Sequence, residues 1–207
     1  APAVDLVRVP DGLPMEMAAS ATDAGMTSYS ALFRIGQAKP DMKIGLIGIG
    51  GLGQFALRAA IAKGFEHVYA ADISEKAREL ATEIGAKEVV DDIKKLKDAE
   101  LDLIVDYAGF GVTTSDALEV VKPGGTVVLV GMGKLETTIN TFTFITGGKR
   151  LLANVGGTPQ DIAEIYELMV EGKLTPKLTK ISFEEIPDGI EQLKQGKVKG
   201  RLVAVYD

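Results

Sequence analysis

The chain has 207 residues, of which 46% are hydrophobic, and it carries a formal net charge of −6. Such a chain can bury one substantial core together with flanking pieces, and its scattered basic residues exclude the electrostatic footprint of a nucleic-acid-binding protein. No apolar run reaches the roughly 18 residues of a membrane span, and the absence of cysteine excludes disulfides and thiolate metal ligands. We expect a cytoplasmic protein with neither nucleic-acid nor membrane partners.

The residues before the first predicted sheet strand divide into an extended piece at 4–9 and helical stretches around 15–19 and 27–35. A nucleotide-binding core does not require this segment. We therefore expect it to belong to a second lobe rather than to the central sheet.

A glycine-rich turn comes next, between an apolar strand at 43–49 and an Ala- and Leu-rich helix at 54–63. The turn at 48–53 has the spacing GxGxxG, and Gly64 is placed to end the helix. That spacing alone arises by chance on the order of 0.3 times in a chain with this glycine content. The strand and helix on either side therefore carry the interpretation that the turn binds a dinucleotide.

The chemistry of a diphosphate explains the residue types in this turn. Gly48 permits the tight turn, Gly50 lets the backbone approach the pyrophosphate, and Gly53 lets the helix pack closely on the strand. The free N–H groups and the dipole of the helix then face the phosphates, so no basic side chain is needed. Gly51 and Leu52 complete the turn, although the beginning of the helix is the simpler role of Gly51.

An acidic residue follows the second apolar strand at 67–71. Asp72 lies 24 residues after Gly48, close to the roughly 20 residues expected for the carboxylate that accepts the adenosine ribose hydroxyls. Its charge repels a 2′-phosphate, so NAD is favoured over NADP. NADP stays an alternative because polar or basic residues lie nearby, namely Ser74, Lys76 and Arg78.

Further strand and helix signals alternate along the rest of the chain, which predicts an α/β fold with a doubly wound, Rossmann-type parallel sheet and flanking remnants of a second lobe. Ser74 and Thr158 are predicted N-caps. The predicted strands lie at 87–91, 101–107, 126–130, 150–155, 178–183 and 202–206, and the helices at 113–121, 160–170 and 185–194.

Groups able to polarise or protonate a substrate oxygen are almost absent. Hydride chemistry on a nicotinamide usually needs a metal, a histidine or a Tyr-Lys pair. The one histidine, His67, opens the second strand, at the end opposite to the expected ligand crevice. None of the five tyrosines is followed four residues later by lysine, and only carboxylates are available as zinc ligands.

A family resemblance accounts for this combination. The chain, from about Val9 to its end, resembles the C-terminal, cofactor-binding portion of medium-chain zinc-dependent alcohol dehydrogenases. Relatives in that family begin with a GroES-like catalytic lobe, so the chain looks like a truncated enzyme or an excised domain. The segments that carry the resemblance are residues 18–32, the turn 48–53, Asp72, residues 122–125, residues 155–157 and Gly200-Arg201.

The resemblance implies roles for individual residues. Asp23 stands where many relatives have a zinc-ligating cysteine, which makes it a candidate ligand in the intact parent only; in this chain, where no zinc is expected, a helix N-cap is the alternative. Thr27 corresponds to a contact on the nicotinamide side, and Arg201 to an arginine that reaches the pyrophosphate. The full set of expected cofactor-binding residues is Thr27, Gly48, Gly50, Gly51, Leu52, Gly53, Asp72, Ile73, Ala108, Val130, Gly131, Val155 and Arg201.

The expected function is therefore the NAD-binding portion of an alcohol dehydrogenase, which transfers hydride between an alcohol or carbonyl substrate and nicotinamide in the intact parent; the isolated chain is expected to be inactive. The expected division is a linker from the missing lobe at 1–24, the dinucleotide-binding domain at 25–157 and a returning segment at 158–207. The alternatives are a non-catalytic nucleotide-sensing module, a zinc-free enzyme of the quinone-reductase kind and an S-adenosylmethionine methyltransferase.

An expected homodimer rests on two features. Surfaces that normally pack on the missing lobe should leave apolar patches exposed, and such patches promote association. Residues 137–144 alternate Thr with Ile or Phe, which predicts an edge strand able to pair with another chain.

Overall fold

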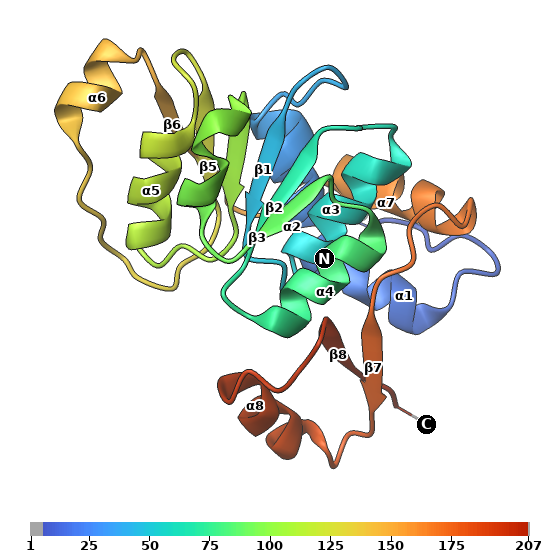
Figure 1. Cartoon of the computed structure of the whole chain (residues 1–207). Helices are drawn as coiled ribbons and strands as arrows, with labels where there is room; N and C mark the ends of the chain where they lie inside the picture. The colour runs from blue at the N-terminus through green and yellow to red at the C-terminus, as the bar shows by residue number, and fades with distance from the viewer. Residues whose placement is uncertain (1–5, 207) are drawn as a thin grey trace.

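The computed structural model describes residues 6–206, which form a six-stranded parallel sheet covered by helices and a separate two-stranded unit near the C-terminus (Figure 1). The order in the large sheet is β3-β2-β1-β4-β5-β6, with every neighbouring pair parallel. This is the predicted doubly wound fold. The strands are β1 (Ile44–Ile47), β2 (Val68–Ala71), β3 (Glu88–Val90), β4 (Leu103–Asp106), β5 (Thr126–Leu129) and β6 (Arg150–Ala153).

The burial of each strand follows its place in the sheet. All four residues of β1, β2 and β4 are buried, as expected where helices cover both faces. The outer strands β3 and β6 are partly or fully exposed, and they are also the more polar ones, with Glu88 and Arg150 at their starts. The apolar runs in the sequence therefore locate the centre of the sheet.

Two separate apolar layers cover the sheet. On one face, α3 (Gly53–Ala62) and α4 (Glu75–Ile84) pack against β1, β2 and β4 through residues such as Leu57 and Leu46. On the other face, α5 (Val112–Val120) and a 3₁₀ segment (Ile93–Ala99) pack through Leu118 and Leu96. Gly64 ends α3 with a positive φ of 82°, as its position predicts.

The N-terminal region is one continuous helix over residues 15–35 rather than two separate stretches. It comprises α1 (Met15–Ser20) and α2 (Met26–Tyr29), each followed by a wider helical turn, at Ala21–Gly25 and Ser30–Ile35. Gly25 keeps helical angles (φ −64°, ψ −58°), so it does not interrupt the helix. Of the extended piece expected at 4–9, residues 4 and 5 lie outside the described residues, and residues 6–9 form no strand.

The expectation of an edge strand at residues 137–144 is wrong. Asn140 instead caps the short helix α6 (Thr141–Thr146), with its side-chain oxygen accepting hydrogen bonds from the N–H groups of Phe142 and Thr143. A local cap of this kind competes directly with strand pairing. The outer strand on this side of the sheet is β6.

The predicted caps of the two other helices have different outcomes. Thr158 is the N-cap of α7 (Pro159–Val170), as predicted, and it also forms a reciprocal capping box with Asp161. Ser74 occupies the N-cap position of α4, but its side chain makes no cap hydrogen bond. Its backbone N–H donates to the Asp72 carboxylate, which holds the chain just before the helix.

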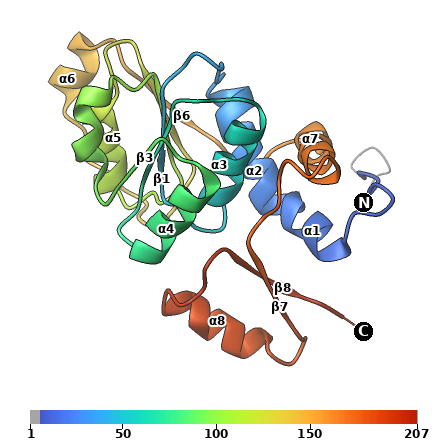
Figure 2. The same ribbon diagram turned by 45° about the vertical axis from the view of Figure 1, so that its right-hand side comes forward.

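The C-terminal unit lies beside the sheet domain, next to the long N-terminal helix (Figure 2). It contains β7 (Leu178–Ile181), α8 (Ile186–Lys194) and β8 (Arg201–Ala204), with β7 and β8 parallel. The buried side chain of Gln54 in α3 anchors it by accepting from the N–H of Lys177 (2.8 Å) and donating to its carbonyl (3.2 Å). Between residues 6 and 206, no helix has the length and apolar character that crossing a bilayer requires.

Candidate functional site

The carboxyl ends of β1, β2 and β4 meet at one edge of the sheet, and the glycine-rich turn lies there. Gly48 has a positive φ of 84°, which favours glycine. A Cβ added at Gly53 would lie 1.9 Å from the carbonyl oxygen of Gly48, so only glycine fits, whereas a Cβ at Gly50 would meet nothing within 4 Å. The outer two glycines are therefore required by the fold, and the middle one leaves backbone accessible to a ligand.

Asp72 lies between this turn and the start of α4. One carboxylate oxygen accepts a hydrogen bond from the N–H of Ile49 (2.7 Å), and the other from the N–H of Ser74 (2.8 Å). A carboxylate has about four acceptor positions, so two bonds leave capacity for hydroxyl groups of a ligand. Sequence reasoning assigned Asp72 to a ribose and missed that it also holds two backbone turns together.

A cleft of about 360 Å³ opens beside Asp72. Gly48, Asp72 and Ile73 line one side, and Ala108 and Phe110 line the other. The side chains of Ile73 and Phe110 are largely presented to solvent, with exposed fractions of 91% and 52%. Apolar walls flanked by a few polar groups suit a flat aromatic base.

Two residues that shape this cleft were missed by sequence reasoning. Phe110 follows the carboxyl end of β4, and its position in a strand-end loop was the available signal. Asp106 is fully buried and ends β4, where it accepts hydrogen bonds from the N–H groups of Ala108 (3.0 Å) and Gly109 (2.9 Å). It also accepts from the hydroxyls of Thr113 (2.7 Å) and Thr114 (2.8 Å). Asp106 thus fixes the loop that carries Ala108 and Phe110.

The remaining expected contacts lie toward β5 and β6. The N–H groups of Val130 and Gly131 both donate to the backbone carbonyl of Asp106 (3.0 Å). Gly131 lies so close to Ala108 that an added Cβ would be 2.4 Å from its carbonyl carbon. Val155, just beyond β6, is 96% exposed. These residues follow the carboxyl ends of β5 and β6, at the same end of the sheet as the cleft.

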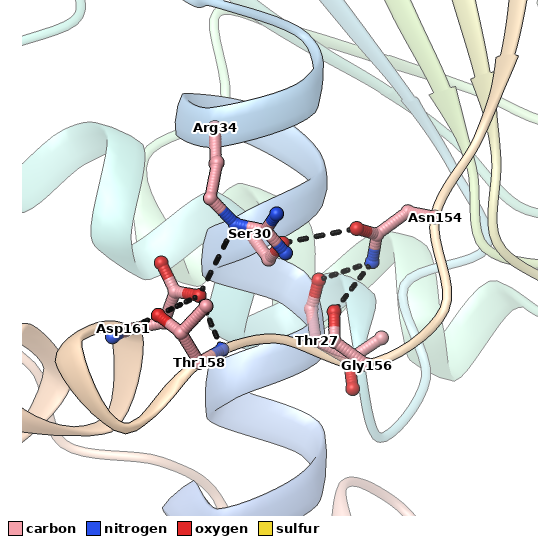
Figure 3. A network of polar contacts seen from close by, with 7 residues as sticks. All are labelled: Thr27, Ser30, Arg34, Asn154, Gly156, Thr158 and Asp161. Carbon is pink, nitrogen blue, oxygen red and sulfur yellow. Dashed lines mark hydrogen bonds and ion pairs between the residues drawn. The ribbon is translucent and has the colours of Figure 1, made fainter.

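A buried polar network supports this second half of the site (Figure 3). The side-chain oxygen of Asn154 accepts from the Ser30 hydroxyl (3.0 Å), and its amide nitrogen donates to the carbonyls of Thr27 (3.1 Å) and Gly156 (3.0 Å). Asn154 therefore joins the long helix to the loop after β6. Sequence reasoning singled out Thr27 but missed Asn154, because two of its three partners, Thr27 and Ser30, are more than 120 positions away in the chain.

The long helix and the C-terminal unit also meet at the glycine-rich turn. The Ser28 hydroxyl donates to the carbonyl of Leu52 (2.7 Å). Arg201 crosses Gly51, where an added Cβ would lie 3.1 Å from its Cγ, and its guanidinium donates to Asp23 (3.1 Å). Asp23 is inside a helical turn with no cap hydrogen bond, so the N-cap alternative for it is wrong.

The described residues do not form a metal site. Across residues 6–206, no three His, Asp or Glu side chains converge in a way that could hold a metal ion. The carboxylate of Asp23 is engaged by Arg201 instead. His67 lies just before β2, at the opposite edge of the sheet, where its ring contacts the Lys87 ammonium (2.8 Å).

These features define the class of protein to which the chain belongs. A parallel sheet of this strand order, with a glycine-rich turn after β1 and a carboxylate after β2, is a Rossmann-type nucleotide-binding fold. A protein-family model described as zinc-binding dehydrogenase matches residues 51–171, which identifies the family. The chain belongs to the zinc-binding dehydrogenase family.

Similar proteins agree with this membership. The chain is 32% identical to an alcohol dehydrogenase of Geobacillus stearothermophilus, over 98% of this chain and 61% of that protein. An acetophenone reductase of Geotrichum candidum, solved in complex with NAD, superposes with a TM-score of 0.88 at 33% identity, over 97% of this chain and 58% of the other. A CAD of Helicobacter pylori, complexed with NADP(H), has a TM-score of 0.83 at 26% identity, over 96% and 57%. The chain therefore spans about 60% of the length of these relatives.

Proposed function

We propose that this chain is the NAD-binding portion of a zinc-dependent alcohol dehydrogenase that transfers hydride between an alcohol or carbonyl substrate and nicotinamide. The observation that carries the proposal is Asp72, whose carboxylate lies at the end of β2 and binds the N–H of Ile49 in the glycine-rich turn. Diphosphate and ribose recognition thereby share one edge of the sheet. Membership in the dehydrogenase family supports the reaction class.

The chain's own residues divide the work of binding. The turn 48–53 offers backbone N–H groups at the start of α3 for the diphosphate. Asp72 accepts the ribose hydroxyls, and Ile73 and Phe110 enclose the adenine. Thr27, Ala108, Val130, Gly131 and Val155 line the part of the cleft that receives the nicotinamide half. When bound, the nicotinamide supplies or takes up the hydride.

The preference for NAD follows from charge. A 2′-phosphate on the adenosine ribose would lie beside the Asp72 carboxylate, which repels it. The similar structures support both coenzymes in the family, because one is described with NAD and the other with NADP(H). We therefore assign NAD to this chain on Asp72 rather than on the relatives.

We assign no zinc site to this chain taken alone. Among residues 6–206, Asp23 has no other ligand beside it, and no histidine lies at the cleft. In the intact parent we propose Asp23 as one zinc ligand, with the others on a catalytic lobe. The division into residues 1–24, 25–157 and 158–207 belongs to the same proposal; the long helix at 15–35 crosses its first boundary.

Calorimetric titration with NAD, NADP and S-adenosylmethionine tests the ligand class and Asp72 together. We expect the wild type to bind NAD most tightly and S-adenosylmethionine not at all. Asp72→Ala removes hydrogen bonds to a charged acceptor, so NAD should bind roughly 10- to 100-fold more weakly, with less discrimination against NADP. Glu66→Gln, an exposed charge change before β2, is the control and should leave both affinities unchanged. An unaltered NAD/NADP preference in Asp72→Ala would remove Asp72 from this role.

A further inference from the structure

The guanidinium of Arg78 is bonded to the backbone on which the ribose-binding carboxylate sits. Its Nη1 donates to the carbonyl oxygen of Asp72 (2.9 Å) and to that of Ile73 (2.9 Å). Arg78 projects from the first turn of α4, six residues after Asp72. One side chain thus holds the two residues that face the cleft from the end of β2.

Three further hydrogen bonds restrain Asp72. The N–H of Asp72 donates to the carbonyl of Val90 in β3 (3.0 Å), and the Asp72 carboxylate binds the N–H groups of Ile49 and Ser74. The Asp72 and Ile73 carbonyls would otherwise rely on solvent. Arg78 completes the restraint, because a charged donor makes stronger bonds to carbonyls than a neutral one.

The surroundings of Arg78 also argue against a role in binding phosphate. Its charge faces Asp91 in the wall of the cleft, where the pKa of Asp91 is held below its ordinary value, mainly by a hydrogen bond from Lys95 and to a smaller extent by Arg78. The carboxylate of Asp72 is a second nearby anion. The Nη1 of Arg78 is committed to two carbonyls, and the nearby carboxylates of Asp72 and Asp91 give a 2′-phosphate negatively charged surroundings here.

We propose that Arg78 is a positioning residue that fixes Asp72 and Ile73 for the adenosine half of NAD and does not receive the 2′-phosphate of NADP. This inference rests on the proposed NAD-binding function. In the sequence, Arg78 kept NADP as an alternative because it is a basic residue near Asp72. The proposal instead assigns Arg78 to positioning the carboxylate.

Two variants separate positioning from phosphate recognition. Arg78→Met keeps the apolar stem but removes the donors, and should weaken NAD and NADP equally, by roughly three- to tenfold, the effect of about one net hydrogen bond. Arg78→Gln retains a neutral donor and should recover most of the NAD affinity. A selective loss of NADP in Arg78→Met, or no loss of either coenzyme, would overturn the proposal.

Lys76→Met is the matched control. Lys76 lies in the same helical turn and is exposed, and its side chain makes no hydrogen bond or ion pair with another residue of the range 6–206, so its substitution removes the same charge without the same contacts. Its affinity for NAD should stay within about twofold of the wild type. A loss equal to that of Arg78→Met would assign the effect to net charge and overturn the positioning role.

Amide hydrogen exchange without coenzyme distinguishes failure of this inference from failure of the proposed function. The N–H groups of Ile49 and Ser74, both bound to Asp72, should exchange faster than in the wild type in Arg78→Met. Their exchange rates should be unchanged in Lys76→Met. If the wild type does not bind NAD, the proposed function fails while the exchange result still decides whether Arg78 holds the turn. Unchanged exchange in Arg78→Met would refute the restraint itself.

Discussion

At the scale of single residues, the glycines of one turn have separable tasks. Gly53 faces the carbonyl oxygen of Gly48 at a distance that leaves no room for a Cβ, whereas Gly50 faces open space. The spacing GxGxxG does not reveal this difference, because it shows only which positions are glycine. The surroundings of each Cα distinguish packing from ligand access.

Substitution of these two glycines should therefore affect different measurements. Gly53→Ala forces the backbone of the turn apart and should lower the free energy of unfolding by roughly 1–3 kcal/mol or more. Gly50→Ala should leave stability nearly unchanged but weaken NAD, because the methyl group occupies the approach to the diphosphate. Urea denaturation and NAD calorimetry on both variants check this; equal destabilisation would contradict it.

Arg201 provides a second prediction at the same scale. Its guanidinium lies across Gly51 and should meet the diphosphate, so Arg201→Met should weaken NAD by roughly tenfold through loss of a charge-assisted hydrogen bond. Arg8→Met is the control, since the one ion pair of Arg8 within residues 6–206 is with exposed Asp11 (3.3 Å). An unchanged calorimetric affinity of Arg201→Met for NAD would show that Arg201 does not bind the coenzyme and acts only in its ion pair with Asp23.

The candidate site was only partly predictable from such residues. Asp72 and the turn glycines act through the chain immediately around them, so their spacing was informative. Asp106 has local partners as well, but a carboxylate inside the apolar run 101–107 was counted as strand alone. Asn154 and Phe110 gave weaker signals, because their roles depend on segments that only folding brings together.

At the scale of elements, the carboxylate of Glu164 in α7 joins the long N-terminal helix through a hydrogen bond and the end of α3 through an ion pair. The hydroxyl of Tyr29 donates to Glu164 (2.7 Å), and the ammonium of Lys63 lies 3.4 Å from the same carboxylate. The Tyr29 hydrogen bond and the Lys63 charge lower the pKa of Glu164. Burial and the Glu164 carboxylate raise the pKa of Tyr29. The contact therefore favours an ionised Glu164 and a neutral Tyr29.

The lowered pKa of Glu164 predicts a pH dependence. Its stabilisation is fully present above the ordinary value of 4.5 and is lost as the pH falls through the lower folded-state value. Glu164→Gln should cost about 0.5–1 kcal/mol at neutral pH, allowing for partial exposure, and less as the pH falls below 4.5. Urea denaturation at neutral pH and at a pH below 4.5 checks this, with exposed Glu167→Gln as the control. A difference in unfolding free energy between wild type and Glu164→Gln that does not change with pH would contradict it.

Elements whose boundaries follow from periodicity were predicted best. The strands of the large sheet and helices α3, α5 and α7 lie within a few residues of their expected positions. Residues 137–144 failed because strict alternation over a short span also fits a capped helix. The continuous helix at 15–35 was predicted as two stretches, at 15–19 and 27–35. Gly25, between them, keeps helical angles and packs against α7, where an added Cβ would lie 3.2 Å from Ile165.

At the scale of the whole molecule, this chain should bind coenzyme without turnover. With NAD, added zinc and simple alcohols, we expect no formation of reduced nicotinamide above the protein-free rate, followed by ultraviolet absorbance. Within residues 6–206, no His, Asp and Glu side chains converge to hold a metal ion, and His67 contacts Lys87 at the opposite end of the sheet. Measurable turnover by the chain alone would reveal a catalytic group in a place where none is recognised.

The homodimer also stays a prediction. Residues 137–144 do not supply the pairing strand, because part of this segment is in α6. Exposed apolar side chains are present elsewhere, including Phe183 and Tyr206 in the C-terminal unit. Sedimentation equilibrium over a range of concentrations tests association; a monomer throughout would contradict it.

The α/β architecture, the glycine-rich turn and the carboxylate after β2 could be inferred from the chain because they depend on apolar periodicity and on spacings within one strand-helix-strand unit. The buried Asn154 network and the Asp23–Arg201 pair became visible only in three dimensions. Asp23 and Arg201 are 178 positions apart, and hydrogen bonds depend on distances of about 3 Å that long-range packing sets. Short-range order can therefore be inferred from sequence, whereas polar contacts between distant segments are decided by how the layers pack.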